Sequence, residues 1–361
     1  MSRPNNQNTA PVTTPGSPSW MELPGHAKSY IYALHSQLLF TQWMAPEIFN
    51  TEQAFHLEVL LRFAGKYAPH YRESLKRIIQ LPDRGLNDHH FQNLPLLSRH
   101  DLQQREDYIV IRKRLENHGM TRTTTVPQPN GRPVEIMTTD LVTTWNRAIT
   151  LRCQDWHGYD VSLNNLNICD PIRQGVNTPD RWSELPWSGP STDLSIDRPV
   201  EDLFNELIRI DPYYLQTRPS ILRSLVELSV SRGIKPQNLR EVRCRCEHLD
   251  RETRDRVEKA WGVSVIHILY TPEIGTIALQ CPESTNLHIQ SEYVKLEILN
   301  DDDLACSSGQ VGRLVATSLH NYRMPLIRFD TGIQAEAAAT CQCGRTLPVL
   351  THMPGRNGTK P

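Results

Sequence analysis

Two short segments, sixty residues apart, each pair side chains that commonly bind zinc. The first runs from Cys281 to His288, and the second is Cys341-Gln-Cys343. Three cysteines and one histidine in two close pairs form the ligand set of a closed, tetrahedral zinc site. The alternative is a group of buried thiols and a surface histidine that hold no metal. We predict that the four side chains meet in space and bind one structural zinc ion, which restricts how the chain between them can fold.

The composition predicts a soluble globular protein that does not bind nucleic acid or membranes. Lysines and arginines number 39 against 40 aspartates and glutamates, a net charge of −1, so no attraction to polyanions is expected. No apolar run approaches the ~20 residues of a membrane helix. The first seven residues do not resemble a secretory signal. Cys-x-Cys pairs at 244/246 and 341/343 would form strained disulfides, so we expect a reducing, cytoplasmic location.

The composition changes along the chain and indicates an N-terminal tail followed by a folded region. Residues 1–19 are rich in Asn, Thr, Pro and Ser and are expected to be a disordered tail, with structure beginning near Trp20. Residues 170–200 are expected to be irregular, and Ser98 to cap a helix. Alternating helices and strands between about 215 and 330 predict α/β layering. Helices are expected at 51–64, 73–79, 219–232 and 250–260, and strands at 263–270, 294–298 and 312–319.

An ordered series of short motifs extends through the second half of the chain. In this order and spacing it resembles the phenylacetate–coenzyme A ligase-like branch of the adenylate-forming ligases, and the resemblance covers roughly residues 60–356. Two upstream pieces, Tyr67-Ala-Pro-His-Tyr71-Arg72 and Leu94-Pro-Leu-Leu-Ser98, look like the opening of the same family. The later motifs are Asp211-Pro-Tyr-Tyr-Leu215, Tyr270-Thr-Pro-Glu273-Ile-Gly275, Gly309-Gln-Val-Gly312-Arg313, Met324-Pro-Leu-Ile-Arg328-Phe329, Cys341-Gln-Cys-Gly-Arg345 and Gly355-Arg356.

The resemblance implies the large N-terminal domain of such a ligase, a layered α/β domain with mixed sheets, over residues 20–352. Residues 353–361 would then be a hinge remnant, and the small C-terminal domain with its lysine would be absent. Enzymes of this family use ATP to convert a carboxylic acid into an acyl-adenylate and then pass the acyl group to a thiol. The family resemblance suggests an aryl or other bulky carboxylic acid as the small-molecule partner.

The same resemblance assigns roles to individual residues. Glu273, which follows Tyr270, stands where the family binds magnesium and forms the adenine pocket. Arg328 is expected near the ribose or the phosphates, so these two are the candidate catalytic residues. The cofactor-binding residues implied by the resemblance are Thr123, Thr124, Thr125, Gly131, Tyr270, Thr271 and Asp330.

Three features depart from the family pattern on the nucleotide side. The phosphate loop at 123–133 has one glycine, and two of its prolines, Pro127 and Pro129, each remove an N–H donor within the loop. Ile333 stands where the family has an acid for the ribose hydroxyls, a loss of roughly 1.5–3 kcal/mol. Glu273 is one residue short of the usual spacing from the tyrosine. We therefore expect the binding of ATP and magnesium to be weak or absent.

Two classes of function follow from these features. The first is an acyl-adenylate-forming ligase that is impaired, or that depends on a partner for the missing C-terminal domain. The second is a catalytically inactive pseudoenzyme that serves as a binding or scaffolding subunit. In either case a second copy or a partner protein is expected to cover the face beside the hinge, because an uncovered apolar face is a liability in a soluble monomer.

Overall fold

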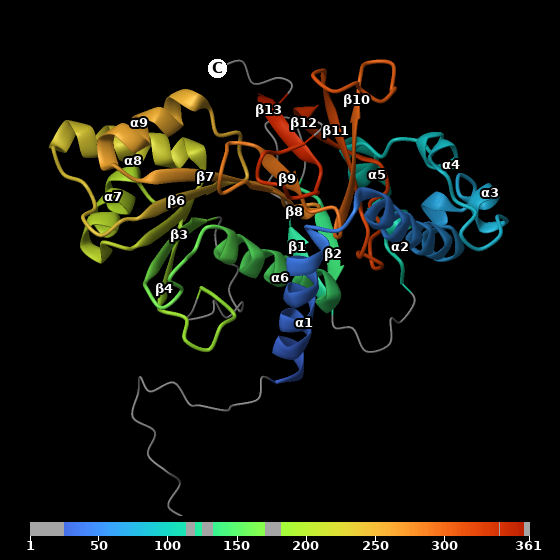
Figure 1. Ribbon diagram of the computed structural model, residues 1–361, viewed down its shortest axis with the longest axis horizontal. Coiled ribbons are helices and arrows are strands. Elements are labelled where there is room, and N and C mark those ends of the chain that lie inside the picture. Colours follow the sequence, from blue (N-terminus) through green and yellow to red (C-terminus); the bar gives the residue numbers. More distant parts are fainter. Residues whose placement is uncertain (1–24, 113–119, 125–132, 170–181, 339, 357–361) are drawn as a thin grey trace, which may run out of the picture.

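The computed structural model describes residues 25–112, 120–124, 133–169, 182–338 and 340–356. Helices are layered on one large mixed sheet, which confirms the predicted α/β fold class (Figure 1). The expected tail at 1–19 lies outside these ranges, as do residues 20–24 and 357–361. Within the described residues, the helices are too short or too polar to cross a membrane.

Across the described ranges, the sheet has eleven strands in the order β10-β11-β12-β13-β9-β8-β7-β6-β5-β3-β4. Strands β4, β3, β5, β6 and β7 pair in parallel, and the pairs from β7 to β10 are antiparallel. A separate hairpin pairs β1 (Met120–Thr124) with β2 (Glu135–Thr139). The bounds of the other strands are β3 (Asn165–Cys169), β4 (Ser191–Ser195), β5 (Tyr214–Thr217), β6 (Glu241–Arg245), β7 (Ser264–Thr271), β8 (Gly275–Gln280), β9 (Leu287–Ile289), β10 (Val294–Leu299), β11 (Val311–Ser318), β12 (Phe329–Ala338) and β13 (Val349–Arg356).

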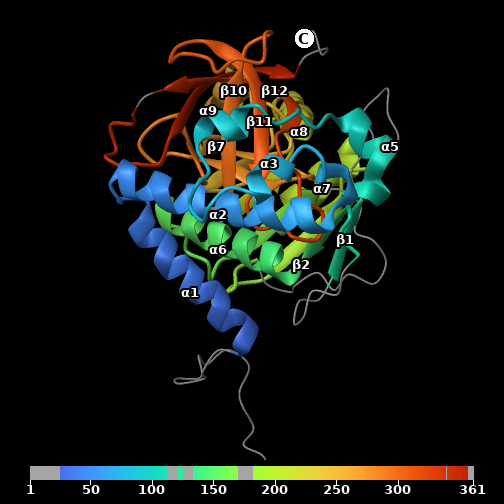
Figure 2. The ribbon, with the colours of Figure 1, turned by 90° about the vertical axis from the view of Figure 1, so that its right-hand side faces the viewer.

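Helices cover both faces of the parallel strands. In Figure 1, α8 (Pro219–Arg232) and α9 (Arg251–Trp261) lie above these strands, and α6 (Asp140–Trp156) lies below them. Figure 2 shows α1 (His26–Thr41) running along α6. The other helices are α2 (Pro46–Tyr67), the 3-10 turn η1 (Pro69–Tyr71), α3 (Lys76–Ile79), α4 (Asp88–Gln92), α5 (Arg99–Ile109) and α7 (Val200–Ile210).

Helix ends agree with the sequence where a local cap fixes them. Helix α8 begins at Pro219 and ends before Gly233, whose φ of 65° suits glycine. The Ser98 hydroxyl accepts a hydrogen bond from the backbone N–H of Asp101 at 3.1 Å, so the predicted cap of α5 is confirmed.

Three expected boundaries differ from the structure. Helix α2 begins at Pro46 instead of near Thr51, because proline fits the first turn of a helix. The helix expected at 73–79 is confined to Lys76–Ile79. The segment 170–200, expected to be irregular, contains β4, because Ser191–Ser195 pairs in parallel with β3. Residues 170–181 of that segment lie outside the described chain.

The buried histidine His267 makes stability depend on pH. It lies in β7, and burial lowers its pKa to about 4, below the ordinary 6.5. The unfolded chain therefore takes up a proton as the pH falls through 6.5, whereas the folded protein does so only near pH 4. Stability is complete above pH 6.5 and is lost between these values, by about 2 kcal/mol from pH 7 to pH 5. Urea unfolding at both pH values tests this: His267→Gln should show a smaller loss than the unchanged protein, and an equal loss contradicts it.

Candidate functional site

The four predicted zinc ligands meet at one end of the antiparallel strands. Their ligand atoms all lie within 4.8 Å of one another. The Sγ atoms of Cys341 and Cys281 are 3.7 Å apart, and Cys343 Sγ lies 3.3 Å from His288 Nε2. Zinc–ligand bond lengths in a tetrahedron imply sulfur–sulfur distances of about 3.8 Å and sulfur–nitrogen distances of about 3.5 Å. The four side chains therefore have the spacing of a closed tetrahedral site.

Strand pairing brings the two ligand pairs together. Cys281 follows β8, His288 lies in β9, and Cys341 and Cys343 lie in the connection from β12 to β13. Because β9 pairs with both β8 and β13, these chain segments converge at one end of the three strands. The sheet topology thus places side chains that are sixty positions apart in the sequence within contact distance.

The surroundings of the cluster lower the pKa of two ligands, His288 and Cys341, whereas burial raises the pKa of the Cys281 thiol to about 11. His288 Nδ1 lies 3.3 Å from the Leu347 carbonyl and donates to it, so Nε2 faces the cysteines. Burial lowers the pKa of His288 to about 4, which keeps the imidazole neutral. Burial acts to raise the pKa of the Cys341 thiol, but hydrogen bonds from the Cys343 N–H and from Ser284 bring it down to about 7. A neutral imidazole and an ionisable thiol suit metal ligation.

Glu273, the expected magnesium residue, is buried in the turn between β7 and β8. Its carboxylate forms an ion pair with the guanidinium of Arg99, the first residue of α5. The neighbouring Thr271 uses its hydroxyl to accept a hydrogen bond from the Ile274 N–H at 3.3 Å. A magnesium ion at Glu273 would have to share the carboxylate with Arg99. Sequence reasoning missed Arg99, because only folding brings α5 to this turn.

The aromatic ring of Tyr270, an expected nucleotide contact, already carries a cation on one face. Arg245, the last residue of β6, places its guanidinium carbon 4.0 Å from the ring centroid. Cation–π contacts of this length are attractive. A nucleotide base that used the same face of the ring would have to displace Arg245.

Arg328, the second catalytic candidate, has structural partners. Its guanidinium donates to Glu297 through two hydrogen bonds, at 2.9 and 3.0 Å, and also to the backbone carbonyls of Gln92 and Leu94. The arginine is 3% exposed. Because these contacts use its donors, Arg328 joins β10 and β12 to the end of α4 and has little capacity left for a ribose or a phosphate.

The two positions expected at the ribose lie in β12. Asp330 accepts hydrogen bonds from Arg313 at 3.1 Å and from the Gly332 N–H at 2.9 Å. Ile333 is half-buried, packs against the hydrophobic core and pairs with Arg356 of β13. Asp330 thus interacts with Arg313, and Ile333 is an apolar residue that packs against the core.

The predicted phosphate loop follows β1 in the sequence. Thr123 and Thr124 belong to this strand, where they pair with Ile136 and Glu135 of β2. Thr125 and Gly131, the other predicted phosphate contacts, lie outside the described residues. The role of the loop therefore stays a prediction.

Strand β6 contributes two arginines that sequence reasoning did not select. Residues alternate between the faces of a strand, and Cys244 packs into the hydrophobic cluster with α7, α8 and α9. Arg243 and Arg245 therefore point to the opposite face, where both line a cavity bounded by α6. The sequence signal is the spacing of the two arginines, which places them on the same face of the strand. The sequence does not show that this face lines a cavity, because that requires knowing which face Cys244 buries.

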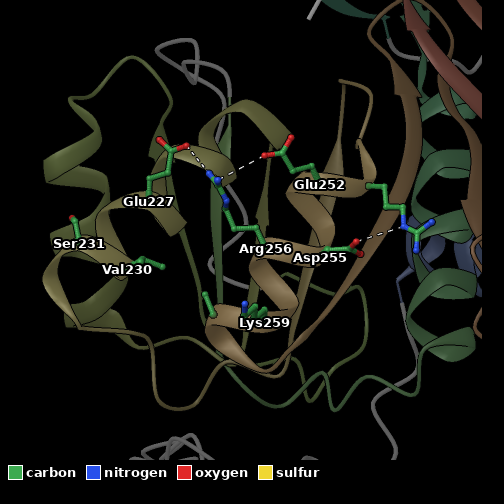
Figure 3. A pocket seen from close by; sticks show the side chains of 9 residues that line it. Glu227, Val230, Ser231, Glu252, Asp255, Arg256 and Lys259 are labelled. Atoms are coloured by element: carbon green, nitrogen blue, oxygen red, sulfur yellow. Dashed lines mark hydrogen bonds and ion pairs between the residues drawn. The ribbon is translucent and has the colours of Figure 1, made fainter.

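A further groove, of about 990 Å³, lies elsewhere, between α8 and α9 (Figure 3). Its charged groups pair with one another: Arg256 contacts Glu227 at 3.0 Å and Glu252 at 3.7 Å, and Arg251 contacts Asp255 at 3.5 Å. Among the described residues of this lining, Lys259 is the one charged side chain without an ion-pair partner.

Comparison with known proteins supports the ligase resemblance. No protein-family model matches the chain. Phenylacetate-coenzyme A ligase of Thermus thermophilus is 29% identical over 169 residues, which are 45% of this chain and 36% of that enzyme. The aligned region thus spans about a third of the length of the curated relative.

Solved structures show the same fold. 2-Hydroxyisobutyryl-CoA ligase, in an open conformation with 2-HIB-AMP and CoA, matches with a TM-score of 0.68 at 18% identity, over 84% of this chain and 69% of that chain. Its postadenylation state with R3-HIB-AMP gives 0.70 at 17% identity, over 87% and 69%. At these identities the likeness establishes the fold, and the chemistry of the site has to be argued from the residues of this chain.

Proposed function

Given that this chain belongs with the phenylacetate–coenzyme A ligase-like branch of the adenylate-forming ligases, we propose that it binds a carboxylic acid and is impaired in forming the acyl-adenylate. The single observation that carries the proposal is the occupation of the nucleotide side by the protein itself. Arg245 covers Tyr270, and Arg99 holds the Glu273 carboxylate. Ile333, an apolar residue at the expected ribose position, is also expected to weaken nucleotide binding.

Active ligation with ATP and transfer to a thiol is the second candidate, and Glu273 favours it. A carboxylate buried in the turn between β7 and β8 is costly unless it is paired or used. Arg99 pairs with it in the described structure, and a magnesium–ATP complex could replace that cation. Developing negative charge on the phosphates would then be stabilised by the metal and by neighbouring cations. The two candidates differ in whether nucleotide binds and pyrophosphate exchange occurs.

Titration calorimetry with ATP and magnesium tests the proposal directly. We expect weak or undetectable binding, because two of the expected contacts, Tyr270 and Glu273, already have cationic partners. Replacing Arg245 by alanine should free the ring of Tyr270, and Ile333→Asp should restore an acid, so each should strengthen any latent binding by roughly tenfold. The assay of acid-dependent pyrophosphate exchange follows the chemistry on the same samples.

Arg240→Ala is the matched control for the Arg245 variant, because the exposed Arg240 lies over Tyr213 at 5.0 Å in a similar arginine–tyrosine contact. It should leave ATP binding unchanged. Low-micromolar, magnesium-dependent binding of ATP by the unchanged protein, together with pyrophosphate exchange, would reject impairment and support the active ligase.

We also propose that the Cys281, His288, Cys341 and Cys343 cluster holds a structural zinc ion. The spacing of the ligand atoms supports this assignment. With four protein ligands the site has no open position for substrate or water, so the metal would connect β8, β9 and the β12–β13 connection and would take no part in a reaction.

A cytoplasmic location is part of the same proposal, because all eight cysteines are free thiols. Cover by a second copy or a partner protein, beside residues 353–356, also stays a prediction. Exposed aromatic side chains at the end of α1 and just after it, Phe40 and Trp43, support an interaction surface on the described part of the chain.

A further inference from the structure

We propose that the cavity beside β6 binds a small dicarboxylic acid, with Arg243 and Arg245 as its anion-binding side chains. The use of this acid as a ligase substrate rests on the proposed function, whereas its binding does not. The cavity has a volume of about 540 Å³, within the range of small-molecule sites. An adjoining inner cavity of about 40 Å³ shares Thr150, Gln216 and both arginines.

Arg243 is a buried cation without a carboxylate partner among the described residues. It is 4% exposed. One of its terminal nitrogens donates to Asn165 Oδ1, and its Nε has no hydrogen-bond partner. The rings of Trp182 and Tyr159 lie 4.9 and 5.5 Å from the guanidinium carbon and fix its position. A buried guanidinium with free donors is suited to a carboxylate ligand.

The acid nearest to Arg243 in the sequence is committed to other groups. Glu241, also in β6, accepts hydrogen bonds from the Tyr159 hydroxyl and from Ser264 at 3.1 Å. Burial raises the pKa of Glu241. No ion pair joins Glu241 to Arg243 in the described chain. Glu241 therefore does not neutralise the charge of Arg243 as an ion-pair partner.

Arg245 lines the same cavity, two residues further along β6. It forms no ion pair within the described residues, and its guanidinium rests on Tyr270, 4.0 Å from the ring centroid. Tyr270 lies near the end of β7, and the turn that follows carries Glu273. A ligand that extends from Arg243 to Arg245 would thus reach the end of the cavity nearest the expected site of chemistry.

The cavity lining carries more positive than negative charge, and the acids in it do not pair with Arg243 or Arg245. The lining includes four cationic and two acidic side chains. Arg147 pairs with Glu184 at 3.2 Å, and Asp193 accepts a hydrogen bond from Asn167 at 2.8 Å. Lys28 lies near the Glu184 backbone carbonyl at 3.5 Å.

The chemistry of the lining favours two carboxylates over a single aryl acid. Residues two apart in a strand are separated by about 7 Å, so each arginine can hold one end of a short diacid. The rest of the lining is polar as well, with the amides of Asn165, Asn167 and Gln216 and the hydroxyl of Thr150. Asn165 donates to Asn167 at 2.9 Å and Asn167 to Asp193 at 2.8 Å, so these amides form a polar wall that suits a charged acid better than an aromatic ring. The lining therefore differs from the aryl pocket that the family resemblance suggested.

Titration calorimetry of the full chain with succinate tests this inference without ATP. Succinate is expected to bind more tightly than monomethyl succinate by roughly ten- to a hundredfold, since the ester loses one charged contact. Benzoate is expected to bind more weakly than either. Tighter binding of benzoate than of succinate, no detectable binding of succinate, or equal binding of inorganic phosphate would each overturn the dicarboxylate assignment.

Gln216→Glu provides a variant that should remain folded. It places an isosteric carboxylate in the cavity with both arginines, so it should supply the missing anion and weaken succinate binding at least tenfold. Arg243→Gln should weaken binding to a similar extent, and circular dichroism reports whether it folds. Arg251→Gln, an exposed arginine of α9, is the control and should bind succinate like the unchanged protein. Unaltered binding by Gln216→Glu would reject the site.

Pyrophosphate exchange separates this inference from the proposed function. Succinate binding without exchange under any condition supports the dicarboxylate site and rejects residual ligase activity. Exchange that depends on benzoate and is unaffected by succinate supports a ligase and rejects a dicarboxylate as its acid.

Discussion

Replacing Cys341 by serine is expected to reduce bound zinc from about one ion per chain to nearly none and to lower the free energy of unfolding by several kcal/mol. Structural zinc contributes on the order of 10 kcal/mol in small zinc-dependent domains. The effect should be smaller here, because strand pairing already holds the ligands of β8, β9 and the β12–β13 connection together. Metal analysis of protein purified without added zinc, followed by urea unfolding, measures both quantities.

Cys306→Ser is the control for the zinc ligand variant. Cys306 is a half-buried free thiol outside the cluster, so its replacement should leave the zinc content unchanged. A zinc content far below one per chain in the unchanged protein would reject the metal site and leave a cluster of buried thiols. Zinc retained at full content by Cys341→Ser would show that this cysteine is not a ligand.

Replacing Arg328 by methionine is expected to destabilise the fold by about 3–5 kcal/mol, because it leaves the Glu297 carboxylate buried without its cation. The backbone carbonyls of Gln92 and Leu94 lose their donor at the same time. Burial already raises the pKa of Glu297. Its protonation in the variant would remove the buried charge, so the difference from the unchanged protein should shrink as the pH falls. Urea unfolding at neutral and acidic pH measures this.

Arg209→Met is the matched control for Arg328→Met. Arg209 also donates to a glutamate, Glu206, through two of its nitrogens, but this pair lies on the surface. Water screens an exposed pair, so its loss should change stability little. Adding Glu297→Leu to Arg328→Met should recover part of the loss. Unchanged stability of Arg328→Met, combined with lost nucleotide binding, would instead support the role that the family resemblance gave to Arg328.

The ends of several helices could be predicted from residues that are neighbours in the sequence. Pro219 and Gly233 carry their own backbone preferences, so they delimit α8 without tertiary help. The Ser98 cap of α5 depends on residues three positions apart. Strand β4 could not be predicted in this way, because Ser191–Ser195 has a mixed burial pattern and becomes a strand by pairing with β3. The start of α2 at Pro46 is also a local feature, because proline fits the first turn of a helix.

The α/β class and the four candidate metal ligands could be predicted from the sequence alone, because periodicity and ligand chemistry are properties of neighbouring residues. The motif order also carried the family resemblance. The partners of the expected nucleotide residues, in contrast, depend on how the chain folds. Arg99 reaches Glu273, Arg245 covers Tyr270 and Glu297 engages Arg328. Each of these contacts joins segments that lie apart in the chain, and the energy of a buried charge depends on the partner that folding supplies, so no local pattern could have revealed them.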